Sequence, residues 1–129
     1  MSAIIRKPAE FYDVSGELRV WNLPWEAVRE FEIRNVPPRV IRGRHAHQTC
    51  KQLIQSSAGS FVVTLKTNSV DSEVIQVHPG IAVEVNPMHW IELSEFSSDA
   101  VVTVLCSEPY TPPIADFDEF LREVANGSV

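Results

Sequence analysis

Two histidines separated by one residue, His45 and His47, are the side chains of this chain best suited to do chemistry. They end the run Arg42 to His47, which reads Arg-Gly-Arg-His-Ala-His within a segment whose neighbours favour an extended backbone. Side chains two positions apart in a strand project from the same face, so we expect both imidazoles to enter one pocket. Such a pair can transfer protons, bind a metal ion or hold an anionic ligand.

The strand that carries the histidines also suggests what surrounds them. If no bulge intervenes, Gly43 shares the face of the two histidines, whereas Arg42 and Arg44 point to the other side. A glycine beside the pair leaves room for a ligand. Burying two imidazoles without a function would require a hydrogen-bond partner for every ring nitrogen. We therefore interpret the pair as a site rather than as two ordinary core residues.

Proton transfer is the use that these residues favour. One neutral imidazole can remove a proton next to a carbonyl group, and its neighbour can return the proton or stabilise the enediolate. This chemistry needs no cofactor. Donors that could face the developing oxyanion lie close in sequence: Arg42, Arg44, Lys51 and Gln52.

A metal site is the second possibility. In cupin barrels a His-x-His pair is often followed by a carboxylate four or five residues later and by a distant third histidine. The corresponding positions here are Lys51 and Gln52, and His89 is the available distant histidine. Because the acid is missing, we expect no metal ligand set and no metal cofactor.

Length and composition set the scale of the protein. With 129 residues, 44% of them hydrophobic, the chain can form one packed core, and we expect a single domain over residues 1–129. The two cysteines, Cys50 and Cys106, do not have the spacing of a thiolate metal site, and we expect buried free thiols. No stretch approaches the roughly 20 apolar residues that cross a membrane, and the first ten residues lack the apolar core of a signal peptide, so we expect a cytoplasmic protein.

The net charge of −6 argues against a nucleic-acid partner, because such proteins need a positive surface to displace counterions from phosphates. A small anionic ligand is compatible with this charge. Four arginines fall within eleven residues and could bind one: Arg34, Arg39, Arg42 and Arg44.

The pattern of apolar residues predicts an all-β fold. From Gly16 to Ser107, short apolar segments alternate with turn residues, most cleanly in Ser60 to Lys66 and Ile81 to Asn86. About eight or nine strands without intervening helices favour an antiparallel barrel or jelly roll over residues 16–107. Apolar residues then recur at spacings of three and four, which predicts one amphipathic helix from Ile114 to Ala125.

Several segments together resemble one known family, the sugar-nucleotide 3,4-ketoisomerases among the WxcM-like small cupins. They are Arg42–His47, Gln52, Ala58–Val63, Pro87–Trp90, Phe96–Asp99 and Leu105–Tyr110. The similarity extends from about Asp13 to Phe120. The Arg-Gly-x-His-Ala-His block combined with the downstream Trp90 and Tyr110 makes it fairly specific.

The resemblance implies a cupin-like double-stranded jelly roll with a short C-terminal helix, without a metal and acting as a homodimer. The family's activity would move a keto group from carbon 4 to carbon 3 of a dTDP-4-keto-6-deoxyhexose through an enediol. That step precedes transamination and acylation to amino sugars of lipopolysaccharide O-antigens, other surface glycans or antibiotics. His45 and His47 would be the catalytic pair, with either as the base.

The resemblance also implies contacts with the substrate. Arg42 and Arg44 would bind the diphosphate, and Gln52 would donate to the sugar. Trp90 and Tyr110 could stack on the nucleotide base, although Trp90 fits equally well in core packing or a dimer interface.

Two positions depart from the family's pattern. The usual Asp-x-Arg-Gly-x-Leu segment reads Asp13 to Leu18 here, with Ser15 in place of the arginine. The usual Tyr-Tyr pair corresponds to Phe31 and Glu32, so a hydroxyl is absent. The lost groups could be replaced by Glu32, Arg29 or Arg34.

Two other functions therefore stay open. One is a non-catalytic cupin that binds a sugar nucleotide or a carbohydrate, which the missing arginine and tyrosine favour. The other is a metal-dependent cupin that uses His45, His47 and His89.

Overall fold

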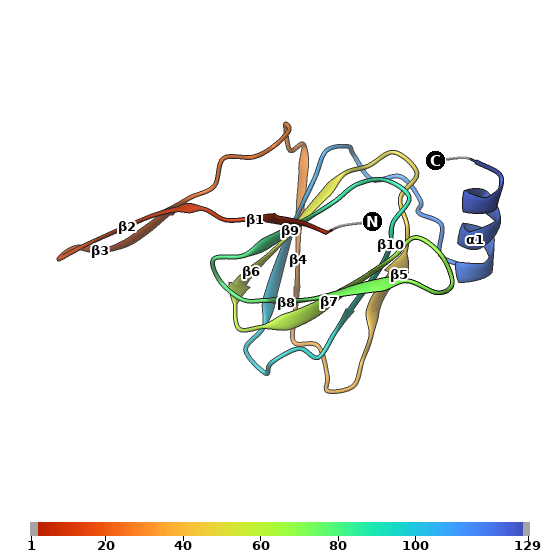
Figure 1. The fold of residues 1–129 in the computed structure, drawn as a ribbon. Helices are drawn as coiled ribbons and strands as arrows, with labels where there is room; N and C mark the ends of the chain where they lie inside the picture. Colours follow the sequence, from red (N-terminus) through yellow and green to blue (C-terminus); the bar gives the residue numbers. More distant parts are fainter. Residues whose placement is uncertain (1–2, 128–129) are drawn as a thin grey trace.

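The structure is a computed structural model that describes residues 3–127. Within this range it contains eleven strands and one helix (Figure 1). The strands are β1 (Ile4–Arg6), β2 (Ala9–Asp13), β3 (Gly16–Val20), β4 (Arg29–Arg34), β5 (Arg42–His45), β6 (Gln52–Ala58), β7 (Phe61–Lys66), β8 (Ser72–Val77), β9 (Ala82–Val85), β10 (Trp90–Ser94) and β11 (Val101–Cys106), and the helix is α1 (Phe117–Ala125).

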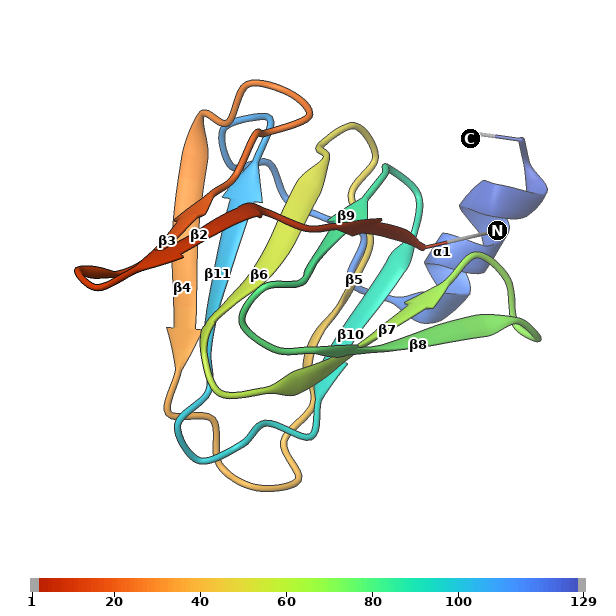
Figure 2. The same ribbon diagram turned by 60° about the vertical axis from the view of Figure 1, so that its left-hand side comes forward.

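Two antiparallel sheets form the barrel. One has the strand order β1-β9-β6-β11-β4, and the other has the order β5-β10-β7-β8 (Figure 2). Neighbours in these orders are distant in sequence, as when β11 lies between β6 and β4, which is the connectivity of a jelly roll. The predicted fold class, a cupin-like jelly roll with a short C-terminal helix, is confirmed.

The alternation seen in the sequence corresponds to the barrel interior. Phe61 and Val63 of β7 are fully buried, and Val83 and Val85 of β9 face them in the same core cluster. Ser60 and Gly59, just before β7, form the turn from β6. A packed interior of branched and aromatic side chains therefore fixes the register of both sheets.

The N-terminal boundary of the barrel differs from the expected residue 16. Strand β1 pairs with β9 through Ile4↔Glu84 and so belongs to the larger sheet. Residue 16 instead begins β3, which pairs with β2 in a separate two-stranded hairpin. This hairpin extends away from the barrel in Figure 1.

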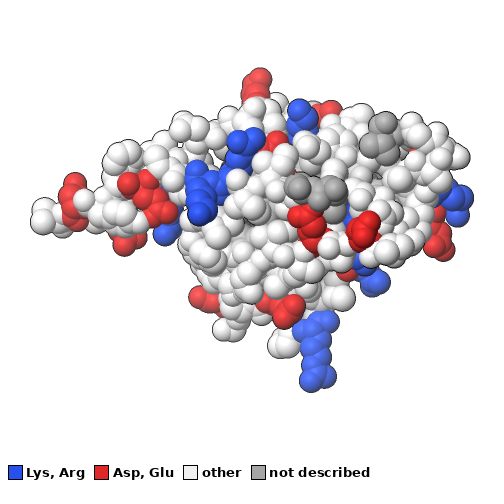
Figure 3. Space-filling view, viewed as in Figure 1, with Lys and Arg blue, Asp and Glu red and all other residues white. Residues whose placement is uncertain are grey.

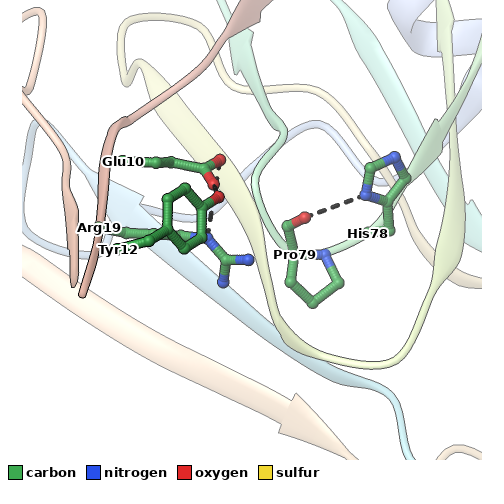
Figure 4. A network of polar contacts seen from close by, with 5 residues as sticks. All are labelled: Glu10, Tyr12, Arg19, His78 and Pro79. Carbon is green, nitrogen blue, oxygen red and sulfur yellow. Dashed lines mark hydrogen bonds and ion pairs between the residues drawn. The ribbon is translucent and has the colours of Figure 1, made fainter. Parts of the chain in front are cut away.

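The base of the hairpin contacts a turn of the barrel. Tyr12 donates to Glu10, and Arg19 Nε lies 3.8 Å from Glu10 Oε1. Figure 4 shows this group beside Pro79, whose carbonyl oxygen lies 3.0 Å from Nδ1 of His78. A Cβ added at Gly80 would lie 3.4 Å from Glu10 Oε1, so a glycine gives the hairpin room to approach the turn.

The C-terminal helix begins later than the periodicity predicted. Ile114 forms a backbone bridge with Ala46 instead of a helical turn, and Asp116 then caps the helix by accepting from the backbone N–H of Glu119 at 3.0 Å. Helix α1 therefore begins at Phe117 and ends at Ala125, as expected at that end. It covers the outside of β10 through Phe120, which is fully buried.

The surface carries charges of both signs. On the face in Figure 3, acidic and basic side chains are interspersed, and neither forms a continuous band. Among residues 3–127, no helix has the length and apolar character needed to cross a bilayer.

Candidate active site

The two histidines lie beside each other at one end of the barrel. His45 is the last residue of β5, and Ala46 after it is held by the bridge to Ile114. The ring centroids of His45 and His47 are 4.9 Å apart, with the planes at 78°. The side chains therefore converge as their spacing predicted, even though His47 lies beyond the end of the strand.

A bulge changes the faces of β5 from those expected. His45 pairs with Ile91 of β10, but Gly43 pairs with the next residue, Glu92. Arg44 is therefore an extra residue in the strand. Both Gly43 and Arg44 have positive φ angles, of 83° and 57°, which is the backbone signature of a bulge built on glycine.

The bulge places Arg42 on the barrel-facing side of β5, where it lines the barrel cavity although it remains exposed. Arg42 pairs with Leu93, a buried core residue, and directly opposite residues of an antiparallel pair share a face. The expectation that Arg42 points away from the histidines is therefore wrong, because it assumed regular alternation. Arg44 is exposed and lines neither of the two cavities beside the histidines.

These two adjoining cavities define the candidate site. The barrel cavity, of about 290 Å³, lies between β4 and β5 and is lined by Phe31, Glu32, Ile33, Arg42, Gly43, His45, Gln52, Ile54, Ile91, Leu93 and Val104. The histidine cavity, of about 230 Å³, is lined by Arg29, Phe31, His45, His47, Gln52, Tyr110 and Pro113. Phe31, His45 and Gln52 border both, so a ligand with two parts could extend from one to the other.

A buried thiol organises the polar wall between the cavities. Cys106 Sγ accepts hydrogen bonds from Gln52 Nε2 and from Arg29 Nη1, each at 3.6 Å. Burial raises the pKa of Cys106, so the thiol stays protonated. Gln52, a predicted site residue, is buried, and Cys50 lies in the loop before β6.

Arg29, which the sequence analysis named only as one of three possible replacements for the missing family groups, lies at the site. Its guanidinium carbon lies 4.8 Å from the ring centroid of Phe31 and 5.3 Å from that of Tyr110. Tyr110, a predicted ligand contact, is 62% exposed at the mouth of the histidine cavity. The hydrogen-bond partner of Arg29 is Cys106, 77 positions away, so no local sequence pattern indicated that Arg29 would lie at the histidines.

Glu32 and Arg34 occupy the outer face of the same strand. Their side chains form an ion pair with each other and are 45% and 58% exposed. Glu32 borders the rim of the barrel cavity, but its carboxylate forms the ion pair with Arg34. Of the three residues that could replace the missing family groups, Arg29 is thus the one with its side chain at the histidines.

Trp90 is not brought to the site. It is buried, its Nε1 donates to Glu92 at 3.0 Å, and its ring packs against Phe117 and Phe120 of helix α1. Neither cavity is lined by Trp90, so the expected stacking on a base is not supported. Of the two interpretations of this tryptophan, the structure agrees with core packing.

Ser15 also lies outside the two cavities. It occupies the turn of the β2–β3 hairpin, where its backbone N–H and its hydroxyl both donate to Asp13. The hairpin extends away from the barrel (Figure 1). Within this chain, the position of the family's arginine therefore does not reach the histidines.

Both histidines are held in the neutral form at pH 7. Burial lowers the pKa of His45, and burial together with repulsion from Arg29, and from His45 whenever that ring is protonated, lowers the pKa of His47 from 6.5 to about 4. The Nε2 atom of His47 is buried, and residues 3–127 offer it no hydrogen-bond partner. A neutral imidazole with an unoccupied ring nitrogen can accept a proton from a ligand.

The third histidine of a cupin metal site is not in place. His89 Nδ1 lies 3.1 Å from the backbone oxygens of both Asn86 and Pro87, and His89 lines neither cavity. Among residues 3–127, no three His, Cys, Asp or Glu side chains are grouped so as to hold a metal ion. The donor set therefore does not favour the metal-dependent alternative.

The fold and the site define a cupin whose histidine pair is suited to acid–base chemistry. A family model described as FdtA, WxcM-like, C-terminal, matches residues 5–125. The TDP-4-oxo-6-deoxy-alpha-D-glucose-3,4-oxoisomerase of Aneurinibacillus thermoaerophilus is 32% identical over 106 residues, which are 81% of this chain and 76% of that protein.

Solved structures agree with this assignment. A 3,4-ketoisomerase from Helicobacter canadensis has a TM-score of 0.91 at 30% identity, covering 97% of this chain and 98% of that one. The TDP-quinovose 3,4-ketoisomerase WlaRB of Campylobacter jejuni has a TM-score of 0.85 at 28% identity, covering 93% and 97%. The chain belongs to the FdtA, WxcM-like family, and the resemblance found in the sequence is confirmed.

Proposed function

We propose that this protein is a sugar-nucleotide 3,4-ketoisomerase that acts on a dTDP-4-keto-6-deoxyhexose. The observation that carries the proposal is the pair of neutral histidines, His45 and His47, whose ring centroids are 4.9 Å apart. They line a cavity that is also lined by Arg29. The oxoisomerase of A. thermoaerophilus and the structural neighbours described above support the same substrate class. The reaction uses proton transfer alone and needs no metal.

The proposed reaction follows from the two imidazoles. One removes the proton at carbon 3, and the C–H electron pair forms the C3=C4 double bond while the carbonyl electrons move to the oxygen at carbon 4. The first imidazole is now protonated, and it passes its proton to the second imidazole. The proton of the carbon 3 hydroxyl moves to the oxygen at carbon 4, the second imidazole delivers its proton to carbon 4, and both imidazoles end neutral. The keto group is then at carbon 3, and the overall composition is unchanged.

The remaining predicted residues receive roles that fit their positions. Arg42 lines the barrel cavity and would bind the diphosphate with its planar guanidinium, and exposed Arg44 could add to this attraction. Gln52 borders both cavities and would donate to the sugar. Tyr110 at the mouth would stack on the base. Glu32 at the rim would contact the sugar only if Arg34 released it.

A homodimer is part of this proposal. The β2–β3 hairpin carries apolar side chains that are largely exposed, among them Phe11 at 56%, Leu18 at 57% and Tyr12 at 65%. Exposed apolar side chains gathered on one element are typical of a protein interface. Light scattering coupled to gel filtration measures the mass directly and is expected to give twice 14.5 kDa.

The proposed cytoplasmic location is supported by the cysteines. Cys50 and Cys106 are both buried free thiols. Free thiols are typical of a reducing compartment.

The activity is tested by following dTDP-4-keto-6-deoxyglucose with proton NMR. We expect the wild-type protein to convert it to the 3-keto isomer, and His47→Ala to lose conversion. His78→Ala is the matched control, because His78 is exposed and lies outside both cavities. Binding of the sugar nucleotide without conversion by the wild-type protein would favour the non-catalytic alternative.

A further inference from the structure

Arg29 is a cation that faces inward without a matching anion. It begins β4, is partly buried, and pairs across the sheet with fully buried Cys106. Arg6, Arg19 and Arg34 each have a carboxylate partner, but the structure gives none to Arg29 within residues 3–127. Removing a charge from water without pairing it is unfavourable, so this position indicates a site for negative charge supplied by a ligand.

The surroundings fix the orientation of this guanidinium. Nη1 donates to Cys106 Sγ at 3.6 Å. The guanidinium carbon lies over the rings of Phe31 and Tyr110, 4.8 Å and 5.3 Å from their centroids. None of these contacts neutralises the charge. A guanidinium has five N–H donors, and the bond to Cys106 is the one that the described residues engage. The other donors remain available to a ligand in the histidine cavity.

The histidine cavity brings Arg29 together with both imidazoles. His45, His47 and Arg29 line the same space of about 230 Å³, whereas Arg42 lines the neighbouring barrel cavity. In a sugar ring whose carbon 3 lies at the histidines, carbon 4 is the neighbouring ring atom, and its carbonyl oxygen lies two bonds from carbon 3. An N–H donor in the same cavity can therefore reach the oxygen on which charge develops.

We propose that Arg29 is a catalytic residue that donates hydrogen bonds to the enediolate oxygens during the isomerisation. This inference rests on the proposed ketoisomerase function. When the C–H electron pair at carbon 3 becomes the C3=C4 bond, the carbonyl electrons place a negative charge on the oxygen at carbon 4. Arg29 stabilises that charge and, after protonation at carbon 4, its planar fork faces the new carbonyl oxygen at carbon 3.

This role also accounts for the serine that occupies the family's arginine position. Ser15 lies in the hairpin turn, bonded to Asp13, so in this chain it supplies no cation to the histidines. Arg29 supplies one from the barrel wall. Fixed donors in a site of limited solvent access stabilise developing charge more than the same donors would in water.

The test compares Arg29→Met with Arg122→Met. The methionine keeps the packing of the arginine stem and removes the charge, and Arg122 is the control because it is an exposed arginine of helix α1 that lines neither cavity. We expect kcat of Arg29→Met to fall by about a hundredfold or more, as when one oxyanion donor is removed, with the dissociation constant for TDP within about threefold of wild type. Arg122→Met is expected to stay within about twofold of wild type in both quantities.

A second variant separates catalysis from folding. In Arg29→Ala the side chain leaves space at the cavity, and added guanidinium at millimolar concentration is expected to restore part of kcat in a saturable manner. Thermal unfolding is recorded for each variant. If Arg29→Ala does not fold, the kcat of Arg29→Met decides.

The outcomes separate the inference from the function on which it rests. A kcat of Arg29→Met within about threefold of an active wild type would overturn the role of Arg29 and leave the ketoisomerase function standing. A rise in KM with unchanged kcat would also overturn it, because Arg29 would then bind substrate and transition state equally. A wild-type protein without turnover would instead refute the function itself.

Discussion

Ala46 and Ile114 exchange both of their backbone hydrogen bonds, at 2.9 Å from Ala46 N to Ile114 O and 2.8 Å in return. Ala46 separates the two histidines, and Ile114 follows the Pro113 that lines their cavity. These two hydrogen bonds attach the segment from Tyr110 to Ile114 to the backbone that follows β5 and carries the histidines. The position of the cavity wall therefore depends on the helix that continues from it.

The helix should contribute both to stability and to the site. Phe120 is fully buried against Trp90 and Phe117, so Phe120→Ala is expected to lower the free energy of unfolding by about 3–5 kcal/mol. Urea denaturation measures this loss, and exposed Arg122→Ala is the control. A loss below about 1 kcal/mol would show that the helix does not pack as described.

The bulge in β5 should depend on glycine at position 43. Gly43 has a φ of 83°, and an added Cβ would lie 3.0 Å from the carbonyl oxygen of Ile91. Gly43→Ala is therefore expected to cost about 1–3 kcal/mol and to weaken TDP binding, because Arg42 loses its inward position. Gly127→Ala is the control, since its φ of 71° is similarly strained but a Cβ added there would meet no atom of the described residues within 4 Å. Equal TDP affinity in Gly43→Ala and wild type would contradict the role given to the bulge.

The low pKa of His47 makes the stability of the protein depend on pH. Since burial and nearby positive charges lower its pKa from 6.5 to about 4, the unfolded chain binds a proton between these values while the folded chain does not. The free energy of unfolding should thus fall as pH falls from about 6.5 to 4. In His47→Gln, the free energy of unfolding should change less between pH 7 and pH 5 than in the wild-type protein. Urea denaturation at the two pH values measures this difference. An unchanged slope would mean that His47 is not held neutral.

The lowered pKa of His47 also predicts where kcat/KM declines on the acid side of its pH profile. Neutral His47 persists below pH 6, so kcat/KM should decline only toward pH 5 and below rather than near 6.5. In Arg29→Met, one of the charges that lower the pKa of His47 is gone, and the limb should move to higher pH. A limb that moves to lower pH in this variant would contradict the arrangement.

Cys106 should act through the two donors that it holds. Cys106→Val keeps an apolar side chain in this buried position but leaves Arg29 Nη1 and Gln52 Nε2 without their acceptor. We expect kcat to fall at least about tenfold with a smaller change in thermal stability, and Cys106→Ser, which keeps an acceptor, to recover most of it. Similar kcat values for the two variants would assign Cys106 to packing alone.

The sequence predicted those features that depend on local periodicity. The alternation of Phe61, Val63 and Leu65 marked the core face of β7, and the spacing of His45 and His47 predicted their convergence. These features follow from the geometry of one strand, which holds whatever strand lies beside it.

Features that depend on pairing between distant segments could not be predicted in the same way. The bulge at Arg44 exists only in the register of β5 against β10, and it reversed the expected orientation of Arg42. Arg29 is held at the site by its hydrogen bond to Cys106, and Trp90 packs against Phe117 of helix α1. In each case the partner is set by the fold and leaves no mark next to the residue.

The most direct test of the central claim is solvent deuterium entering the sugar. The protein is incubated with dTDP-4-keto-6-deoxyglucose in deuterium oxide, and proton NMR follows carbons 3 and 4, with His45→Ala, His47→Ala and a protein-free sample alongside. We predict a 3-keto product that carries deuterium at carbon 4 with the wild-type protein, and neither product nor label with the variants. Binding of the sugar nucleotide by the wild-type protein without any label at carbon 3 or 4 would contradict the account.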